Sequence, residues 1–268
     1  MKKGDWVIAK YTGIGSWRTH IQCEEDAVMR VEKEGLSRAQ VGTVGVNPVT
    51  AWRMLRDFVD LKEGDWFIQN GANSGVGRAA IQLGKKWGLK NVAVVRDRPG
   101  DEGTRLRKEL EELGATKVVT EAEVLDRGFK EQIHEWTSGG RSPIRLALNC
   151  VGGKPATALA KVLAPDAYMV TYGAMSKQPL QIPASMLIFK NLNFSGFWVS
   201  RWSDKNPEEK RKTVEELLEM MRRGEMRDVP VVEVPWEWGT GREELVEAVQ
   251  GTLEGFRRGK GVLVFGDT

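Results

Sequence analysis

The sequence has few of the residues from which metal centres and disulfide frameworks are built. Its 268 residues include two cysteines, Cys23 and Cys150, and two histidines, His20 and His134. Neither a four-cysteine zinc site nor a disulfide network can be assembled from this set. We therefore expect no metal site, and a protein that works in a reducing compartment.

Long apolar runs and a strong excess of one charge are also missing. No stretch approaches the roughly 18 apolar residues that cross a bilayer, and MKKGDWVIAK at the start lacks the features of a signal or transit peptide. Lys and Arg number 40 against 37 Asp and Glu, which gives a formal net charge of +3. This balance shows no excess of basic residues that would indicate nucleic-acid binding. We therefore expect a globular protein with neither a membrane nor a nucleic-acid partner.

Glycine, by contrast, is concentrated where a strand pattern gives way to a helix pattern. Residues 70–77 are NGANSGVG, after the apolar run DWFI and before an amphipathic segment. Glycine permits close backbone approach, and the free N–H groups of a helix start favour an anion. The spacing of Gly71, Gly75 and Gly77 does not match G-x-G-x-x-G, so by itself it also fits a tightly packed turn. The order of strand, glycines and helix favours a nucleotide site.

From Asp65 onward the sequence alternates short apolar segments with amphipathic ones. The expected strands are DWFIQN, NVAVVR, KVVT, RLALNCVG, YMVTYG and NLNFSGFWV, and helices such as GTRLRKELEELG and KPATALAKVLA lie between most of them. Such alternation predicts parallel strands joined by right-handed crossovers. The expected fold class is therefore α/β, with a Rossmann-type doubly wound parallel sheet.

The segments on either side of this alternating region carry different patterns. Before it we expect three short strands, in WVIAK, SWRTHIQCEED and AVMRVEK, and then a helix with Asn47 as N-cap and Pro48 as its first residue. After Ser200 we expect two charged amphipathic helices, around EEKRKTVEELLEMMRRG and REELVEAVQGTLEGF, and a last strand GVLVF. These segments predict a second region of mixed organisation.

The second strand of the alternating region indicates which nucleotide is bound. Arg96 lies about 20 residues after Gly77, where a Rossmann unit places the side chain that selects the ribose. An acid at this place accepts from the 2′-hydroxyl of NAD, whereas Arg96 and Arg98 suit the 2′-phosphate of NADP. Asp97 is either the NAD-type acid or a surface partner of the arginines. We expect NADPH, with NAD as the alternative.

Two further strand ends contain glycine turns, in LNCVGG and VTYGAM. Because the carboxyl ends of parallel strands line the ligand crevice, Asn149, Gly152, Tyr172, Gly173 and Met175 are candidates to flank the nucleotide. Taken singly, each also fits an ordinary turn. Tyr172 is typical of a packed tyrosine with its hydroxyl at the rim, and we do not assign it as a general acid.

Several motifs, taken in order, resemble those of one enzyme family. NPVTAWRML, NSGVGRAAIQLGKKWGL, NVAVVRDRP, LALNCVGG, VTYGAMSKQP and IFKNLNFSGFWVS are similar to motifs of the mitochondrial 2-enoyl thioester reductases of the medium-chain dehydrogenase/reductase superfamily. The resemblance implies NADPH-dependent reduction of trans-2-enoyl thioesters, on coenzyme A or acyl carrier protein, in mitochondrial fatty acid synthesis. It also implies a homodimer in the mitochondrial matrix, or a cytosolic protein if the chain is expressed as it stands.

The resemblance further implies which residues hold the cofactor. Asn47 would contact the nicotinamide side, Asn73, Ser74, Gly75 and Val76 the pyrophosphate, and Arg96, Asp97 and Arg98 the 2′-phosphate. The nicotinamide would be lined by Tyr172, Gly173, Ala174 and Met175 and by Phe197, Trp198, Val199 and Ser200, with Lys260 as a further cofactor contact. Without the resemblance, Asn47 fits a helix cap and Lys260 a solvated lysine.

The same family implies a division into domains. Residues 47–200 would form the Rossmann NADPH-binding domain, residues 1–46 part of an incomplete β-rich GroES-like catalytic domain, and residues 201–268 a part that returns to it. The family places further residues before the segment that begins here, among them the tyrosine regarded as its proton donor. Tyr11 does not replace that tyrosine, so we assign no catalytic residue. We expect NADPH binding with poor or absent reduction of enoyl thioesters.

Two other functions stay open on the sequence. A quinone or alkenal reductase of the same superfamily shares the glycine stretch, although RDRP and GFWVS count against it. A non-catalytic protein that binds NADPH or nucleic acid is the alternative from another class. The leading expectation is an NADPH-dependent oxidoreductase that acts on a carbon–carbon double bond.

Overall fold

The chain forms two compact units. A computed structural model describes residues 1–15, 18–253 and 259–266. Asn47–Val199 form one unit, called the inserted unit here, and Met1–Val46 with Ser200–Thr268 form the other, called the flanking unit. In the described part of the chain, no helix combines the length and the apolar character that a membrane crossing requires.

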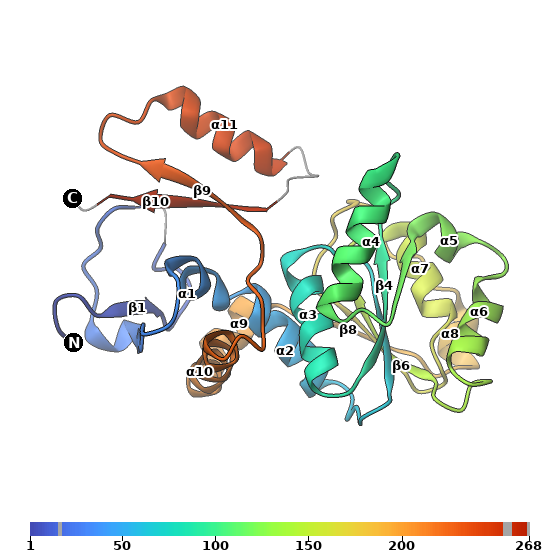
Figure 1. Cartoon of the computed structure of the whole chain (residues 1–268). Coiled ribbons are helices and arrows are strands. Elements are labelled where there is room, and N and C mark those ends of the chain that lie inside the picture. Colours follow the sequence, from blue (N-terminus) through green and yellow to red (C-terminus); the bar gives the residue numbers. More distant parts are fainter. Residues whose placement is uncertain (16–17, 254–258, 267–268) are drawn as a thin grey trace. The chain divides into compact units, whose positions relative to one another are not determined.

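A six-stranded parallel sheet forms the centre of the inserted unit (Figure 1). Its strands are β3 (Trp66–Gln69), β4 (Lys90–Val95), β5 (Lys117–Thr120), β6 (Ile144–Asn149), β7 (Tyr168–Thr171) and β8 (Asn193–Gly196). They lie in the order β5-β4-β3-β6-β7-β8, and every neighbouring pair is parallel. This is the strand order of the doubly wound fold, so the predicted fold class is confirmed. The order reverses between β3 and β6, where such sheets bind ligands.

Helices cover both faces of this sheet (Figure 1). They are α2 (Asn47–Asp57), α3 (Gly75–Lys86), α4 (Asp101–Leu113), α5 (Glu121–Leu125), α6 (Phe129–Trp136), α7 (Gly153–Lys161) and α8 (Ala184–Ile188). Successive residues of β4 show why two layers form, because side chains alternate between the faces of a strand. Ala93 and Val95 join the apolar cluster with residues of α3 and α4, whereas Val92 and Val94 join the cluster with residues of α5 to α8.

The start of α2 differs from the prediction by one residue. The helix begins at Asn47 itself, so Asn47 is its first residue rather than its N-cap, and Pro48 is the second. Proline is still accommodated, because the first N–H groups of a helix have no acceptor within the helix. Helix ends are commonly displaced by this amount, and the predicted element is confirmed.

Within its described residues, the flanking unit contains two small sheets. β1 (Trp6–Ala9) pairs antiparallel with β2 (Val28–Val31), and β9 (Val231–Trp236) pairs parallel with β10 (Lys260–Phe265). Its helical elements are the 3₁₀ turn η1 (Glu25–Ala27), α1 (Arg38–Val44), α9 (Val199–Lys205), which starts at the unit boundary, α10 (Pro207–Arg222) and α11 (Arg242–Leu253). The predicted strand in SWRTHIQCEED is wrong, since residues 18–24 pair with no strand in the described chain and continue into η1. An extended segment without a partner gains no ladder hydrogen bonds.

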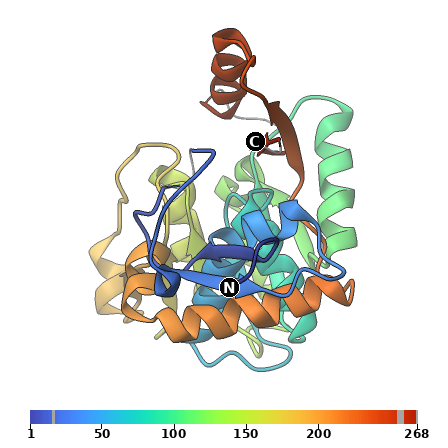
Figure 2. The same cartoon turned by 90° about the vertical axis from the view of Figure 1, so that its left-hand side faces the viewer.

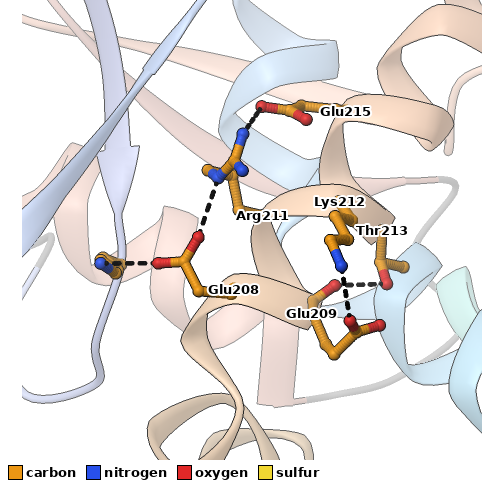
Figure 3. A network of polar contacts seen from close by, with 7 residues as sticks. Glu208, Glu209, Arg211, Lys212, Thr213 and Glu215 are labelled. Atoms are coloured by element: carbon orange, nitrogen blue, oxygen red, sulfur yellow. Dashed lines mark hydrogen bonds and ion pairs between the residues drawn. The ribbon is translucent and has the colours of Figure 1, made fainter.

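Polar contacts attach α10, the long orange helix near the bottom of Figure 2, to the end of β1, and Figure 3 draws part of this network. Lys210 is buried, and its Nζ donates to two main-chain carbonyls there at 2.9 and 3.0 Å. Burial lowers the pKa of this lysine. Lys10 pairs with Glu208 at 3.1 Å, and Figure 3 shows Arg211 between Glu208 and Glu215, at 3.2 and 2.7 Å. Residues 1–46 and 200–268 are thereby joined within one unit.

Candidate cofactor site

The candidate site follows the carboxyl edge of the six-stranded sheet. Five of the parallel strands end at Gln69, Val95, Asn149, Thr171 and Gly196. Parallel strands present these ends at one edge, where doubly wound sheets bind their ligands. The segments that follow β3, β4, β7 and β8 contain most of the predicted cofactor contacts, namely Asn73–Val76, Arg96–Arg98, Tyr172–Met175 and Phe197–Val199.

Two of the predicted contacts belong to the flanking unit instead. Ser200 lies on α9, and Lys260 is the exposed first residue of β10. The main-chain N–H of Lys260 donates to the carbonyl of Pro230 at 2.7 Å, which fixes the start of the strand. The cofactor roles of Ser200 and Lys260 therefore stay predictions.

The turn between β3 and α3 needs glycine at its two ends. Gly71 has a φ of +59°, and a Cβ at this residue would stand 2.5 Å from the Sγ of Cys150. A Cβ on Gly77 would stand 2.5 Å from the carbonyl oxygen of Ala72, which is closer than real Cβ atoms approach. Because that oxygen belongs to the backbone, the helix can close on the turn only with glycine here.

Gly75, between them, brings two predicted cofactor contacts together. It is the first residue of α3, and a Cβ on it would collide with the Nδ2 of Asn47 and stand 3.0 Å from the Cγ of that side chain. The sequence predicts that Gly75 leaves room for a pyrophosphate. The structure adds that the Asn47 amide lies beside the same space, at the junction between α2 and α3.

The first turn of α3 offers donors for an anion. The Oγ of Ser74, the N-cap, accepts from the N–H of Gly77 at 3.1 Å. The N–H groups of Gly75 and Val76 lie in the first turn, where a helix supplies no acceptor. The positive end of the helix dipole also lies there, so the turn can bind phosphate oxygens without a lysine.

Arg78, which the sequence gave no reason to select, supports this turn from behind. Its Nε donates to the carbonyl oxygen of Asn73 at 3.0 Å. Its two terminal nitrogens donate to the carboxylate of Glu109 on α4, at 2.7 and 3.0 Å. The hydrogen bond from Arg78 lowers the pKa of Glu109. Arg78 therefore links the β3–α3 turn to α4.

The end of β4 presents the predicted 2′-phosphate group. Arg96 is exposed, whereas Arg98 is mostly buried and pairs with Glu102 on α4. The carboxylate of Asp97 accepts from the N–H of Ala122, in the first turn of α5, at 3.2 Å. Neither predicted role of Asp97, as the acid of an NAD site or as a surface partner of the arginines, includes this contact. Of the two arginines, Arg96 is thus the more accessible to a phosphate.

Glu121, the first residue of α5, also faces this group, although the sequence did not point to it. Burial raises the pKa of its carboxyl, Arg96 opposes the rise, and Asp97 adds to it. A second acid beside Arg96 competes with a phosphate for the same guanidinium. No local signal could have identified Glu121, because it lies on the following crossover.

A buried amide network joins the strand ends where the strand order reverses. Asn70 and Asn149 are both 0% exposed. The Oδ1 of Asn149 accepts from the Nδ2 of Asn70 at 2.7 Å and from the N–H of Gly152 at 3.2 Å, and the Oδ1 of Asn70 accepts from the N–H of Cys150 at 2.8 Å. The Nδ2 of Asn149 donates to the Oγ1 of Thr171 at 3.1 Å. The Asn149 side chain thus links β3, β6 and β7, and that Asn149 flanks the nucleotide stays a prediction.

Tyr172 also lies deeper than predicted. Its N–H donates to the carbonyl of Asn149 at 2.9 Å, and its hydroxyl is buried instead of lying at the rim. The hydroxyl lies beside the Cys150 thiol and the Ser74 side chain without a well-formed hydrogen bond to either. Burial, followed by the nearby thiol, raises the pKa of Tyr172 well above its ordinary value. The phenol is therefore a neutral donor at physiological pH and not a base.

The predicted nicotinamide end of the site is apolar. Phe197 packs edge-on against Phe58, with ring centroids 6.1 Å apart. Met175 and Trp198 are 79% and 69% exposed. Within the described residues, no group of three or more His, Cys, Asp or Glu side chains could hold a metal ion.

Comparisons with known proteins agree with this geometry. The zinc-binding dehydrogenase family matches residues 75–223. The mitochondrial enoyl-[acyl-carrier-protein] reductase of Yarrowia lipolytica is 47% identical over 261 residues, which cover 97% of this chain and 67% of the relative.

Solved structures of the same kind of enzyme share the fold. The complex of Etr1p with NADP and crotonyl-CoA matches with a TM-score of 0.92 at 36% identity, covering 98% of this chain and 74% of that one. The Etr1p/Etr2p heterodimer of Candida tropicalis, a mitochondrial 2-enoyl thioester reductase, matches with a TM-score of 0.90 at 37% identity, covering 95% and 73%. On this identity and coverage, the chain belongs to the mitochondrial enoyl-[acyl-carrier-protein] reductases, the 2-enoyl thioester reductases of the medium-chain dehydrogenase/reductase superfamily.

Proposed function

We propose that this chain binds NADPH and uses it to reduce trans-2-enoyl thioesters, carried on coenzyme A or acyl carrier protein, in mitochondrial fatty acid synthesis. The observation that carries the proposal is the 47% identity, over 97% of the chain, to an enoyl-[acyl-carrier-protein] reductase. The structural neighbour Etr1p binds NADP and crotonyl-CoA in its complex. When bound, NADPH supplies the hydride for the β-carbon of the substrate.

The residues of the inserted unit fit the phosphates of this cofactor. The pyrophosphate would accept from the N–H groups of Gly75 and Val76, where a Cβ on Gly75 would collide with the Asn47 side chain. Asn73 and Ser74 would complete this turn. Arg96, which is exposed and charged, suits the 2′-phosphate of NADP and offers no acceptor to the 2′-hydroxyl of NAD.

The remaining contacts would position the nicotinamide. In this proposal Asn47 reaches its amide side, and Tyr172–Met175 and Phe197–Val199 line it, while the cofactor roles of Ser200 and Lys260 stay predictions. Apolar side chains such as Met175 and Phe197 would keep water from the reacting carbons. The Tyr172 hydroxyl is buried and its pKa is raised, so in this proposal it does not exchange a proton with the substrate.

Two measurements test the proposal separately. Titration with NADPH and NADH checks the cofactor, and we expect saturable NADPH binding that is tighter than NADH binding. Oxidation of NADPH in the presence of crotonyl-CoA checks the reaction, both for this chain and for a version extended to the full length of the Yarrowia relative. Absence of NADPH binding would overturn the cofactor assignment. Binding of NADPH without turnover by the extended version would overturn the substrate assignment.

We also propose that the protein is a homodimer in the mitochondrial matrix. β8 is an edge strand of the sheet, and Leu187, Ile188 and Phe189, just before it, are exposed apolar side chains. The related structure from Candida tropicalis is a heterodimer, and the Yarrowia relative is named as mitochondrial. Light scattering that showed only monomer at assay concentrations would contradict the dimer. Absence of the full-length protein from the protease-protected fraction of mitochondria would contradict the location.

A further inference from the structure

We propose that Arg78, held in place by Glu109, is a positioning residue that fixes the turn between β3 and α3 for the cofactor's pyrophosphate. The inference rests on the proposed function, because it concerns the same cofactor. Neither residue contacts the pyrophosphate in this proposal. Arg78 acts instead through the peptide group between Asn73 and Ser74.

That peptide group is held from both sides. Its carbonyl oxygen accepts from the Nε of Arg78 at 3.0 Å, and its N–H donates to the carbonyl of Gly71 at 2.9 Å. Ser74 is the N-cap of α3, so the orientation of this peptide decides where Ser74 and the first N–H groups of the helix point. A peptide fixed before binding loses little conformational entropy when the pyrophosphate arrives.

The pairing with Glu109 explains why Arg78 can hold the carbonyl. An arginine in the first turn of a helix lies at the positive end of the dipole, which is unfavourable for a cation. The bidentate pair with Glu109, at 2.7 and 3.0 Å, offsets this charge and fixes the orientation of the planar guanidinium. Arg78 as a whole is only 9% exposed. Because Arg78 is neutralised in this way, it contributes orientation rather than a free charge. Its removal should therefore affect NADPH and NADH equally.

A purely structural link between α3 and α4 is the competing explanation, and a set of three ligands separates the two. NADPH and NADH both contain the pyrophosphate, whereas adenosine 2′-monophosphate contains the 2′-phosphate without it. For Arg78→Met we expect NADPH and NADH to bind about tenfold more weakly, a factor that corresponds to about 1.4 kcal/mol. Adenosine 2′-monophosphate should bind as before. The matched control, Arg96→Met, should also weaken NADPH, but here adenosine 2′-monophosphate should bind more weakly and NADH should bind as before.

A charge swap provides the second test. Arg78→Glu combined with Glu109→Arg restores an ion pair between α3 and α4 but not the donor to the Asn73 carbonyl. We expect its melting temperature to recover relative to Arg78→Met while NADH affinity stays low. Recovery of both NADH affinity and stability in the swap variant would overturn the proposal. For Arg78→Met, equal weakening of all three ligands, or unchanged NADPH affinity, would also overturn it. If the swap does not fold, the ligand set for Arg78→Met decides alone. Failure of the unmutated chain to bind NADPH would instead overturn the proposed function, and this inference with it.

Discussion

Adding one methyl group at either of two nearby glycines should separate the binding role of the β3–α3 turn from its packing role. In Gly77→Ala the new Cβ would stand 2.5 Å from the carbonyl oxygen of Ala72 and 2.6 Å from the carbonyl carbon. Both atoms belong to the backbone, so the helix and the turn must move apart. Overpacking of this kind costs about 1–3 kcal/mol. For a domain of this size, each kcal/mol lowers the melting temperature by about 2–4 °C.

Gly75→Ala meets a different obstacle. The new Cβ would meet the end of the Asn47 side chain, which can rotate away, and the backbone at Gly75 is not in the left-handed region that disfavours alanine. Stability should therefore stay within about 0.5 kcal/mol of the unmutated protein. Cofactor binding should still weaken, because the methyl group enters the space proposed for the pyrophosphate and displaces Asn47. The larger Gly75→Val should abolish NADPH binding and still melt cooperatively.

The assays are thermal melting by circular dichroism and fluorescence titration with NADPH. The reasoning predicts a lower melting temperature for Gly77→Ala and weaker NADPH binding at unchanged stability for Gly75→Ala. Unaltered NADPH affinity in Gly75→Ala would refute it, and would mean that the glycines only pack a helix against a turn. Equal losses of stability in the two variants would refute the distinction between a flexible and a rigid obstacle.

Three further predictions concern charged groups at the same edge of the sheet. Arg96→Ala should weaken NADPH by the roughly 1.5–3 kcal/mol of hydrogen bonds to charged groups and leave NADH unchanged; equal affinity of the unmutated protein for both cofactors would contradict this. Glu121→Gln should tighten NADPH relative to NADH, because it removes the negative charge that competes for Arg96; the ratio of the two dissociation constants is the readout. Arg78 lowers the pKa of Glu109 in the folded state. The stability that Glu109 contributes is therefore fully present above its pKa in the unfolded chain, about 4.3, and it is lost as the pH falls through the lower pKa of the folded state. Glu109→Gln should therefore show a smaller loss of melting temperature over that acidic range.

The parallel sheet could be predicted because each strand is a short apolar run bounded by turn residues, with an amphipathic segment after it. The same signals are weak in the flanking unit. β9, with the sequence VVEVPW, has a proline and a glutamate, and its partner β10 follows only after the whole of α11. Its pairing therefore depends on contacts between distant residues, which no local pattern reports.

In the candidate site, too, local sequence patterns identify some residues and miss others. The glycine turn and the arginines after β4 could be found because backbone conformation and ligand charge require particular residues at adjacent positions. Arg78 and Glu109, 31 positions apart, meet only because α3 packs beside α4 on the sheet. The burial of the Tyr172 hydroxyl likewise depends on how β7 ends against the β3–α3 turn. Contacts of this kind follow from tertiary packing and not from spacing in the sequence.

The interruption of the flanking unit by the inserted unit has a consequence for synthesis on the ribosome. Residues 47–199 are continuous, so their sheet can form as soon as they have emerged. The β1–β2 pair is made before the inserted unit but is joined to α10 through Lys210, which is made after the inserted unit is complete. At about 5–20 residues per second, the delay is roughly ten to thirty seconds. A pair of two strands is marginal in water without further packing, so during this delay the β1–β2 pair lacks the α10 contacts that hold it in the folded protein.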